Sequence, residues 1–472
     1  MNSLLRSSRM SRVRTTLAGL LVFALLASAC GDDGDAGAGD EPTTTASTAT
    51  TPDDAETTTP DDAETTEPST SEAPETLPAS FRGVTETSIK VGVAVPDFDA
   101  LQAAGVSNYQ GDAQIAFQAF FDVINEEGGI FGRQIEPVYV GFNFIDSLTQ
   151  DVACAELTGD HEVFIVLYGL LGESNLCLTD LNDTMVMTRS FQTTDLVERS
   201  GDTVWLQLNA GDDSRVRILA GAMAESGRLD GKTIGILGGG TAADDDALQV
   251  ALTELGFDSL LLETISDRTD PAAVERELAL TAEQFSSSGV DFLFELRGGD
   301  DAAGIFAAEG FTPELAYKAL GASIDGATDP SLLDGAVSVG EIDEDSFFVR
   351  EGFQTNCMDV VRAANPDLVE EMSFIPSGEE QAAGQPSWPN PVMIACDQTK
   401  LLKLIGEIVG AELTNDSFRA ALDDLGPVVL DGYGLASFRS EDKWDGLDEF
   451  FLQIYDAETD SITIGDPIVV DR

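Results

Sequence analysis

One stretch of this chain, residues 89–141, constrains the fold more than any other because it passes from strand to helix to strand. Ile89 to Val95 is rich in Val and Ile and stops at a proline, as a buried parallel strand does. From Gln114 onward apolar residues recur at helical spacing, and Gly128-Gly129 supplies the left-handed conformations that end a helix. Glu136 to Val140 then returns as a second strand. The stretch predicts two parallel strands joined by a right-handed helical crossover.

The end of this predicted helix carries a recognisable turn. It reads Asp122-Val-Ile-Asn125-Glu-Glu-Gly128-Gly129-Ile-Phe-Gly132-Arg133. With the strand before it, the turn resembles the opening of the type I periplasmic binding proteins of the leucine/isoleucine/valine-binding branch, which serve ABC transporters. Members of that branch open with a similar D-x-I-N-x-x-G-G-I-x-G-R turn. The resemblance covers the chain from about Thr87 to the end.

From Thr87 strand and helix patterns alternate, and a new series of strands begins at Thr233 to Leu237. Such alternation predicts an α/β fold with parallel sheets and helices on both faces. The resemblance implies two Rossmann-like lobes joined by a hinge that the chain crosses three times. The expected lobes are an N-lobe of residues 85–209 and 341–432, and a C-lobe of residues 210–340 and 433–472.

The first 29 residues have the pattern of an export signal. Four arginines precede an apolar run from Leu17 to Leu26, and Ala27-Ser28-Ala29 is a small-residue cleavage site. The run is shorter than the roughly 20 residues needed to cross a bilayer. Leu26 to Cys30 resembles a bacterial lipobox of the actinobacterial type, in which Cys30 is lipidated and starts the mature chain. The alternative is ordinary secretion with a chance cysteine.

A tether is expected between this cysteine and the folded region, over residues 30–84. Gly31 to Ser80 contains no Lys or Arg, is rich in Thr, Pro and acidic residues, and repeats Pro-Asp-Asp-Ala-Glu-Thr-Thr. Such a segment cannot bury enough apolar surface to fold. It predicts an acidic stalk that raises a domain from the outer face of the cell membrane.

The whole chain is strongly acidic, with 25 Lys and Arg against 85 Asp and Glu, a net charge of -60. This balance argues against nucleic-acid binding, which needs a basic face. A solvated acidic surface, adapted to salt, is favoured over a dedicated site for a cationic partner.

Apart from Cys30, four cysteines remain, which allow three disulfide connectivities. We favour the pairs of nearest neighbours, Cys154–Cys177 and Cys357–Cys396, and the resemblance implies a disulfide at the first of them. A zinc site is not expected, because no CxxC pair occurs and His161 is the only histidine. No cofactor or metal is predicted.

Candidate ligand residues of the N-lobe follow its strands, because ligands of open α/β sheets bind beyond the carboxyl ends of the strands. Ser174 is expected near a helix N-terminus, which favours an anion, and the resemblance implies that it holds a ligand carboxylate. The alternative is that Ser174 only caps its helix, and Thr193 could equally be a plain turn residue. The N-lobe candidates are Asp97, Phe98, Tyr168, Gly169, Glu173, Ser174, Gln192 and Thr193.

The C-lobe candidates are Gly240, Thr241, Arg297 and Asp325. A nucleotide-binding loop is not expected at Gly238-Gly-Gly240, because these glycines lack the spacing of known phosphate-binding loops. The resemblance implies that Asp325 replaces the acid that pairs a ligand ammonium group. Arg297 either binds a ligand anion or only balances the negative charge of carboxylates on the surface. Tyrosines that the amino-acid binders carry near both loops are absent.

The sequence shows no catalytic constellation. There is no G-x-S-x-G turn, and one exposed histidine cannot anchor a Ser-His-Asp or a Cys-His site. The sequence therefore predicts a non-enzymatic, monomeric substrate-binding lipoprotein of an ABC uptake transporter. Its expected partners are a permease, a membrane reached only through the lipid anchor, and a small polar solute: an amino acid, an amide, a short peptide or an organic acid. The alternatives are a ligand-sensing or docking ectodomain without transport, and a hydrolase with an unrecognised acid pair.

Overall fold

The computed structural model describes residues 77–103, 109–189, 192–239, 242–265, 270–299, 301–341, 350–376, 380–381 and 383–470. The predicted export signal, Cys30 and most of the predicted tether lie outside these residues. No helix within the described ranges is both long and apolar enough to cross a membrane.

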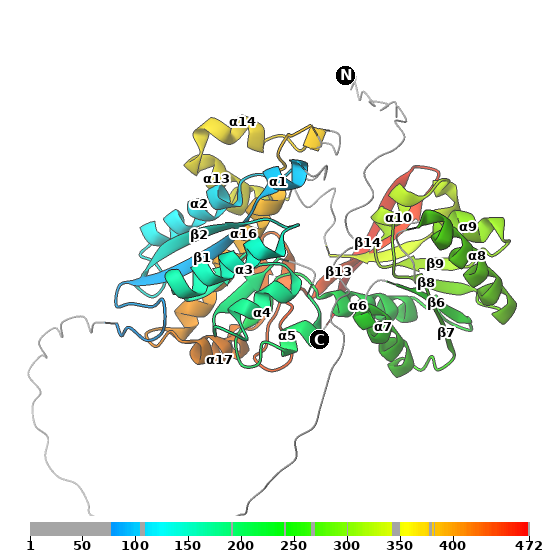
Figure 1. Ribbon diagram of the computed structural model, residues 1–472, viewed down its shortest axis with the longest axis horizontal. Helices are drawn as coiled ribbons and strands as arrows, with labels where there is room; N and C mark the ends of the chain where they lie inside the picture. Colours follow the sequence, from blue (N-terminus) through cyan, green and yellow to red (C-terminus); the bar gives the residue numbers. More distant parts are fainter. Residues whose placement is uncertain are drawn as a thin grey trace, which may run out of the picture. The chain divides into compact units, whose positions relative to one another are not determined.

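The first sheet is fully parallel and has the strand order β2-β1-β3-β4-β5 (Figure 1). Strands β1 and β2 pair along their whole length, from Ser88 opposite Gln134 to Pro96 opposite Phe142, with helix α2 between them in the chain. The predicted crossover is therefore confirmed. The elements are β1 Ser88–Pro96, α2 Ala113–Glu126, β2 Gln134–Phe142, β3 Ile165–Leu167, β4 Met185–Thr188 and β5 Trp205–Gln207.

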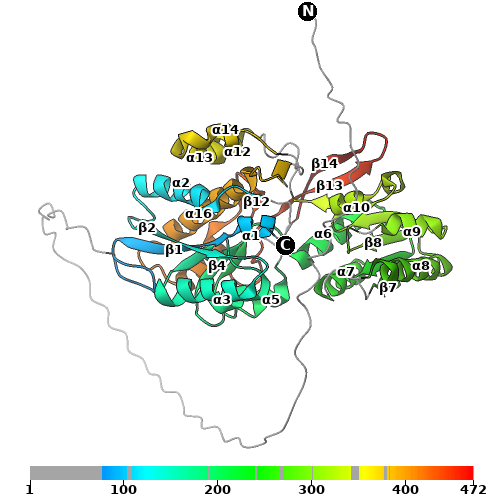
Figure 2. The same ribbon diagram turned by 45° about the horizontal axis from the view of Figure 1, so that its top comes forward.

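Helices cover both faces of this sheet because alternate strand residues point to opposite sides. Val91 and Val93 belong to the core that holds the apolar faces of α2 and of α16 (Pro389–Val409), which pack on each other (Figure 2). Ala94 faces the other core, formed with α3 and α4. The remaining helices of this region are α1 Phe98–Ala103, α3 Ser147–Ala155, α4 Asn175–Leu178, α5 Thr194–Glu198, α12 Glu351–Phe353, α13 Asp359–Ala364, α14 Val369–Met372 and α17 Asn415–Leu425.

The turn that carries the family resemblance joins the end of α2 to the start of β2 and fixes their relative position. The Asn125 side chain donates to the Ile135 carbonyl at 2.9 Å and accepts from the Ile135 N–H at 2.7 Å, which fixes the end of α2 against the start of β2. Gly129 has φ +82°, and a Cβ there would lie 1.9 Å from the Arg133 carbonyl oxygen. The Arg133 side chain is fully buried. These residues build the scaffold and contact no predicted ligand residue.

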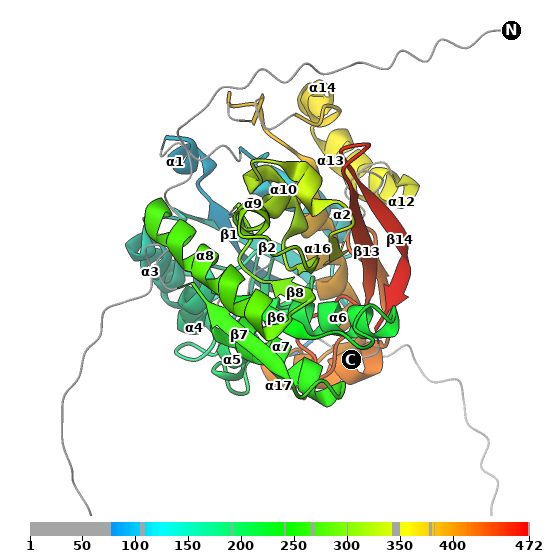
Figure 3. The same ribbon diagram turned by 90° about the vertical axis from the view of Figure 1, so that its right-hand side faces the viewer.

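The second sheet has the order β14-β13-β10-β9-β8-β6-β7, with β7 to β10 parallel to β6 and an antiparallel closing hairpin of β13 and β14 (Figure 3). The predicted new series of strands is confirmed. Its strands are β6 Ile234–Gly238, β7 Leu260–Thr264, β8 Phe292–Glu295, β9 Glu314–Tyr317, β10 Val337–Gly340, β13 Glu449–Asp456 and β14 Ser461–Val469.

Helices again lie on both faces. Ile236 shares a core with Val216 of α6 and Leu248 of α7, whereas Leu293 shares another with Phe285 of α8. The elements concerned are α6 Asp212–Glu225, α7 Ala242–Glu254, α8 Pro271–Ser288, α9 Ala302–Ala308 and α10 Leu320–Gly326.

The chain passes three times between the two sheets: after β5, after β10, and after the small hairpin of β11 (Val428–Leu430) and β12 (Gly434–Ala436). Hydrogen bonds connect the first crossing to the third. The Gln207 N–H donates to the Trp444 carbonyl at 3.0 Å. The Gly211 N–H donates to the Asp445 carboxylate at 2.7 Å. The first and third crossings therefore run side by side.

Both expected disulfides are present, Cys154–Cys177 between α3 and α4, and Cys357–Cys396 between the turn before α13 and α16. They join residues 23 and 39 positions apart.

Replacing both Cys357 and Cys396 with alanine should lower the free energy of unfolding by about 3 kcal/mol, because the disulfide restricts the unfolded chain. Urea unfolding of the variant and the unmodified chain measures the difference. The matched pair Cys154→Ala with Cys177→Ala should lose slightly less, since its loop is shorter. A loss below about 1 kcal/mol for both pairs would contradict this account.

Candidate functional site

The carboxyl ends of β3 and β4 are held together by one buried side chain of α16. Gln398 accepts a hydrogen bond from the Tyr168 N–H at 2.8 Å and donates to the carbonyls of Met187 and Thr188, each at 3.1 Å. Tyr168 has φ +69°, a left-handed conformation that ends β3 at Leu167. The strand is therefore only three residues long, and Tyr168 lies just past its end.

Three phenylalanines gather at the neighbouring ends of β1 and β2. The ring centroid of Phe144 lies 5.6 Å from that of Phe98 and 5.3 Å from that of Phe142. Phe142 is buried, whereas Phe98 and Phe144 are partly exposed. These three rings, here called the aromatic wall, offer apolar surface at the edge of the first sheet where ligands of such sheets bind.

Arg189, directly after β4, lies between this wall and Tyr168. Its guanidinium carbon is 4.7 Å from the centroid of the Phe144 ring and 5.1 Å from that of the Tyr168 ring. Stacking of this kind is favourable for a cation. Arg189 is partly exposed, and no carboxylate of the described residues forms an ion pair with it. The sequence analysis missed this residue; the signal was an arginine at a strand end in a chain with few basic residues.

Glu341, just after β10, and Tyr433, in the turn of the β11–β12 hairpin, interact electrostatically. Burial raises the pKa of Glu341, which forms an ion pair with Arg215 at 3.5 Å and accepts from Asn209 at 3.3 Å. Burial, followed by the charge of Glu341, raises the pKa of the Tyr433 phenol, and the charge of Arg189 opposes that shift. Tyr433 therefore lies within electrostatic reach of Glu341, Tyr168 and Arg189.

The turn that presents Tyr433 is fixed by Asp397. This fully buried carboxylate accepts from the N–H groups of Asp431, Gly432 and Tyr433 at 3.0, 2.8 and 3.0 Å. A side chain at Gly432 would lie 2.4 Å from the Asp397 carboxylate. Burial raises the pKa of Asp397 to about 7. Its neighbour Cys396 is in a disulfide, so the sulfur is not a free metal ligand.

Asp397 should make the protein less stable as the pH rises from about 4 to about 7. In that window the folded chain keeps a proton that the unfolded chain, with the ordinary aspartate pKa, has released. Replacing Asp397 with asparagine removes this titration. Between pH 5 and pH 7 the stability advantage of the unmodified chain over the variant should shrink by about 2 kcal/mol. Urea midpoints at several pH values measure it, and parallel curves for the two proteins would contradict the prediction.

The carboxyl edge of the second sheet carries charges that are paired with one another. Lys318, after β9, lies 2.8 Å from Asp244 and 3.5 Å from Asp212. Glu295, at the end of β8, accepts from the Arg297 N–H at 2.8 Å. Most of the charge at this edge therefore holds the loops in place.

Of the predicted N-lobe ligand residues, the structure brings Phe98, Tyr168 and Gly169 to the aromatic edge. Gly169 has φ +67°, and a Cβ there would lie 2.8 Å from the Thr188 side chain, so glycine lets the chain pass close to β4. Asp97 begins the same loop; its side chain is exposed and accepts from the Ala100 N–H at 3.0 Å, capping α1.

The other N-lobe candidates lie apart from the aromatic wall in their contacts. Glu173 is exposed and pairs with Arg199. Ser174 stands at the N-cap of α4 but makes no side-chain capping bond, so the capping alternative was wrong. Gln192 is buried, and its carbonyl accepts from the Asp212 N–H at 2.9 Å. Thr193 stands at the N-cap of α5, also without a capping bond.

Among the C-lobe candidates, Arg297 is partly exposed after β8, and Asp325 is exposed on α10. Gly240 and Thr241 lie outside the described residues.

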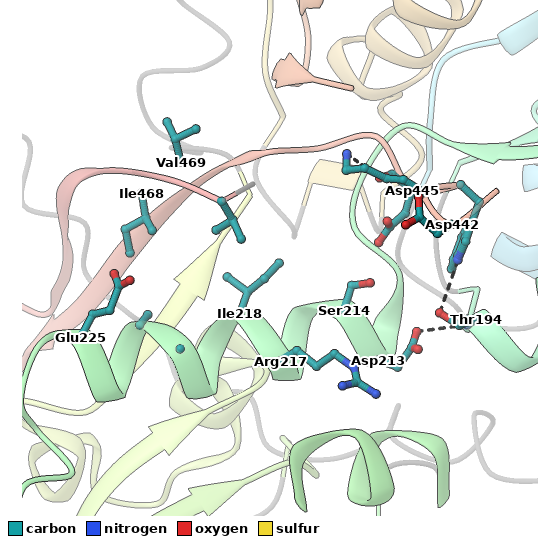
Figure 4. A pocket seen from close by; sticks show the side chains of 15 residues that line it. Thr194, Asp213, Ser214, Arg217, Ile218, Glu225, Asp442, Asp445, Ile468 and Val469 are labelled. Carbon is teal, nitrogen blue, oxygen red and sulfur yellow. Dashed lines mark hydrogen bonds between the residues drawn. The ribbon is translucent and has the colours of Figure 1, made fainter. Parts of the chain in front are cut away.

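One cavity lies beside the crossings and not at the strand ends. It measures about 630 Å³ and is lined by α6, the end of β14 and the Asp442–Asp445 segment, with Ser214 and Ile218 of α6 facing it (Figure 4). Several charged groups that line it are engaged: Asp213 accepts from the Thr194 N–H, and Lys443 donates to three backbone carbonyls. A second cavity of about 490 Å³ shares Thr194 and Trp444.

The sequence matches no protein-family model, and no curated protein matches it. Solved structures are similar in fold. They include an ABC transporter substrate-binding protein from Desulfitobacterium hafniense in complex with Leu, with TM-score 0.52 and 16% identity over 80% of this chain and 99% of that one. A branched-chain amino acid transporter substrate-binding protein from Streptococcus pneumoniae in complex with isoleucine has TM-score 0.51 and 13% identity over 82% and 100%.

A leucine-binding protein from Thermotoga maritima has TM-score 0.50 and 13% identity, over 81% of this chain and 99% of that one. With parallel sheets covered on both faces and three crossings, this likeness shows the two-lobed fold of the type I periplasmic binding proteins. The predicted fold class is confirmed.

Proposed function

We propose that the protein is an extracellular substrate-binding lipoprotein of an ABC uptake transporter. It binds a small polar solute between its two lobes and presents it to a permease. The observation that carries this proposal is the edge formed by Arg189, Tyr168 and the aromatic wall, where a cation and apolar rings meet at the carboxyl ends of the first sheet. The similar structures with bound leucine or isoleucine support a small solute as ligand.

The lobes we propose are residues 85–209 with 341–432, and residues 210–340 with 433–472. Tyr433 lies in the hairpin that precedes the third crossing and is within electrostatic reach of Arg189, so a ligand at Arg189 would lie close to the hinge. Closure of the lobes selects a ligand because both must supply contacts to it. Cys30 would carry the lipid anchor, and the acidic segment after it would serve as the tether. The solute would leave chemically unchanged, since no catalytic role is proposed.

A thermal-shift screen of the chain from Gly31 to Arg472 tests solute binding. Amino acids, amides, short peptides, sugars and organic acids should be supplied at high concentration. At 100 times Kd a ligand adds about 2.7 kcal/mol to stability, which for a folded region of this size raises the Tm by about 3 °C. A shift confined to one chemical class supports the proposal, and no shift by any class would contradict it.

Uptake of the identified solute tests the link to transport. Cells that lack this chain should lose uptake of the radiolabelled solute and regain it when the chain is restored. Binding without any change in uptake would favour the sensing alternative.

A further inference from the structure

We infer that the solute is an organic acid whose carboxylate binds Arg189 and whose apolar body lies against Phe98 and Phe144. This inference rests on the proposed function and adds the chemical class of the ligand.

Arg189 is available for an anion. The chain has 85 acidic and 25 basic residues, yet Arg189 forms no ion pair with a carboxylate in the described part of the chain. Stacking on the rings of Phe144 and Tyr168 occupies the faces of the guanidinium. Its N–H donors lie in the plane of the group and can still bind a carboxylate in a bidentate manner.

The rings beside Arg189 define the rest of the ligand. Phe98 and Phe144 are partly exposed, with Phe142 buried behind Phe144. Phenyl rings have no hydrogen-bonding groups, so they favour an apolar or aromatic body. Burial is the main cause that raises the pKa values of the Tyr168 and Tyr433 phenols, so both stay protonated and add no negative charge beside Arg189.

Two acids of this region already have partners, which disfavours a ligand ammonium group. Glu341 is largely buried, its Oε2 accepts from Asn209 at 3.3 Å, and its Oε1 lies 3.5 Å from the Arg215 Nε, which balances its charge. Asp97 caps the first turn of α1. An acid without an amino group should therefore bind better than the corresponding amino acid.

Calorimetry with the chain from Gly31 to Arg472 tests this inference, using benzoate, 4-methylpentanoate, leucine and the neutral benzamide. We expect benzoate or 4-methylpentanoate to bind, benzamide to bind at least 100-fold more weakly than benzoate, and leucine at least 10-fold more weakly than 4-methylpentanoate. Replacing Arg189 with methionine should weaken the acids at least 100-fold, and Arg189→Lys should recover only part of the loss. Phe144→Ala should weaken the acids about 10-fold.

Arg419→Met is the matched control, because Arg419 is a partly exposed arginine paired with Asp202, and it should leave binding unchanged. Thermal unfolding of each variant checks that it folds, and the comparison of benzoate with benzamide needs no variant. Leucine binding as tightly as 4-methylpentanoate, or any ligand that Arg189→Met leaves unaffected, would overturn the inference while the proposed function stands. Failure of all solute classes would overturn the proposed function itself.

Discussion

Replacing Gln398 with methionine is expected to lower the free energy of unfolding by about 5 kcal/mol, because one side chain satisfies three buried backbone groups. Gln398 is fully buried, and it accepts from the Tyr168 N–H and donates to the Met187 and Thr188 carbonyls. Methionine has a similar volume, so the loss reports the unpaired backbone groups and not a cavity. Urea unfolding at neutral pH measures it.

Gln284→Met is the control for this experiment, because Gln284 is exposed on α8 and pairs only with Glu263. The control should change stability by less than about 0.5 kcal/mol. Gln398→Met should also weaken solute binding, since the ends of β3 and β4 carry Tyr168 and Arg189. A loss of stability below about 1 kcal/mol would show that these strand ends do not depend on Gln398.

Replacing Arg133 with methionine is expected to lower the free energy of unfolding by about 4 kcal/mol. The buried guanidinium donates to the Thr85 carbonyl at 2.9 Å and to the Pro78 and Ala411 carbonyls at 2.8 Å each. These three acceptors come from separate parts of the chain. Methionine keeps much of the volume but leaves the carbonyls without their donor.

Two further variants test the reason for this loss. Arg133→Lys keeps the charge but cannot span the three carbonyls, so it should recover less than half of the stability. Arg276→Met removes an exposed arginine on α8 and should change stability by less than about 0.5 kcal/mol. Equal stability of the lysine variant and the unmodified chain would show that charge, and not geometry, is what Arg133 contributes. Chemical denaturation of all three variants gives the comparison.

Much of the fold could be predicted from the sequence because its signals are local. A stretch of about ten residues is enough to recognise each of three patterns: the helical periodicity after Gln114, the glycines after α2 and the strand at Ile234. Both disulfide pairs followed from nearest-neighbour pairing. The end of β3 at Leu167 could not be predicted, because a left-handed backbone conformation at a tyrosine leaves no pattern in the sequence.

The candidate site was predictable only where it is made by loops that follow strands. Phe98, Tyr168 and Gly169 were found in this way. Arg189 was missed because its role depends on rings from β2 and β3 that the sequence does not bring together. Tyr433 was missed because it reaches the site from a hairpin turn more than 100 residues further along the chain. Glu173 and Asp325 were predicted as ligand residues, but both side chains are exposed in the structure. The sequence alone does not show how exposed a side chain is in the folded chain.

Three consecutive residues of α16 fix three different parts of the molecule. Cys396 holds the turn before α13, Asp397 holds the turn with Tyr433, and Gln398 holds the strand ends beside Arg189. Successive residues of a helix point about 100° apart, so the rotation of α16 about its own axis sets the relative positions of all three. A one-residue shift in this helix would break all three connections together. Substitutions at the sheet edge can therefore change the ligand preference. The rotation of α16 about its own axis has to stay the same.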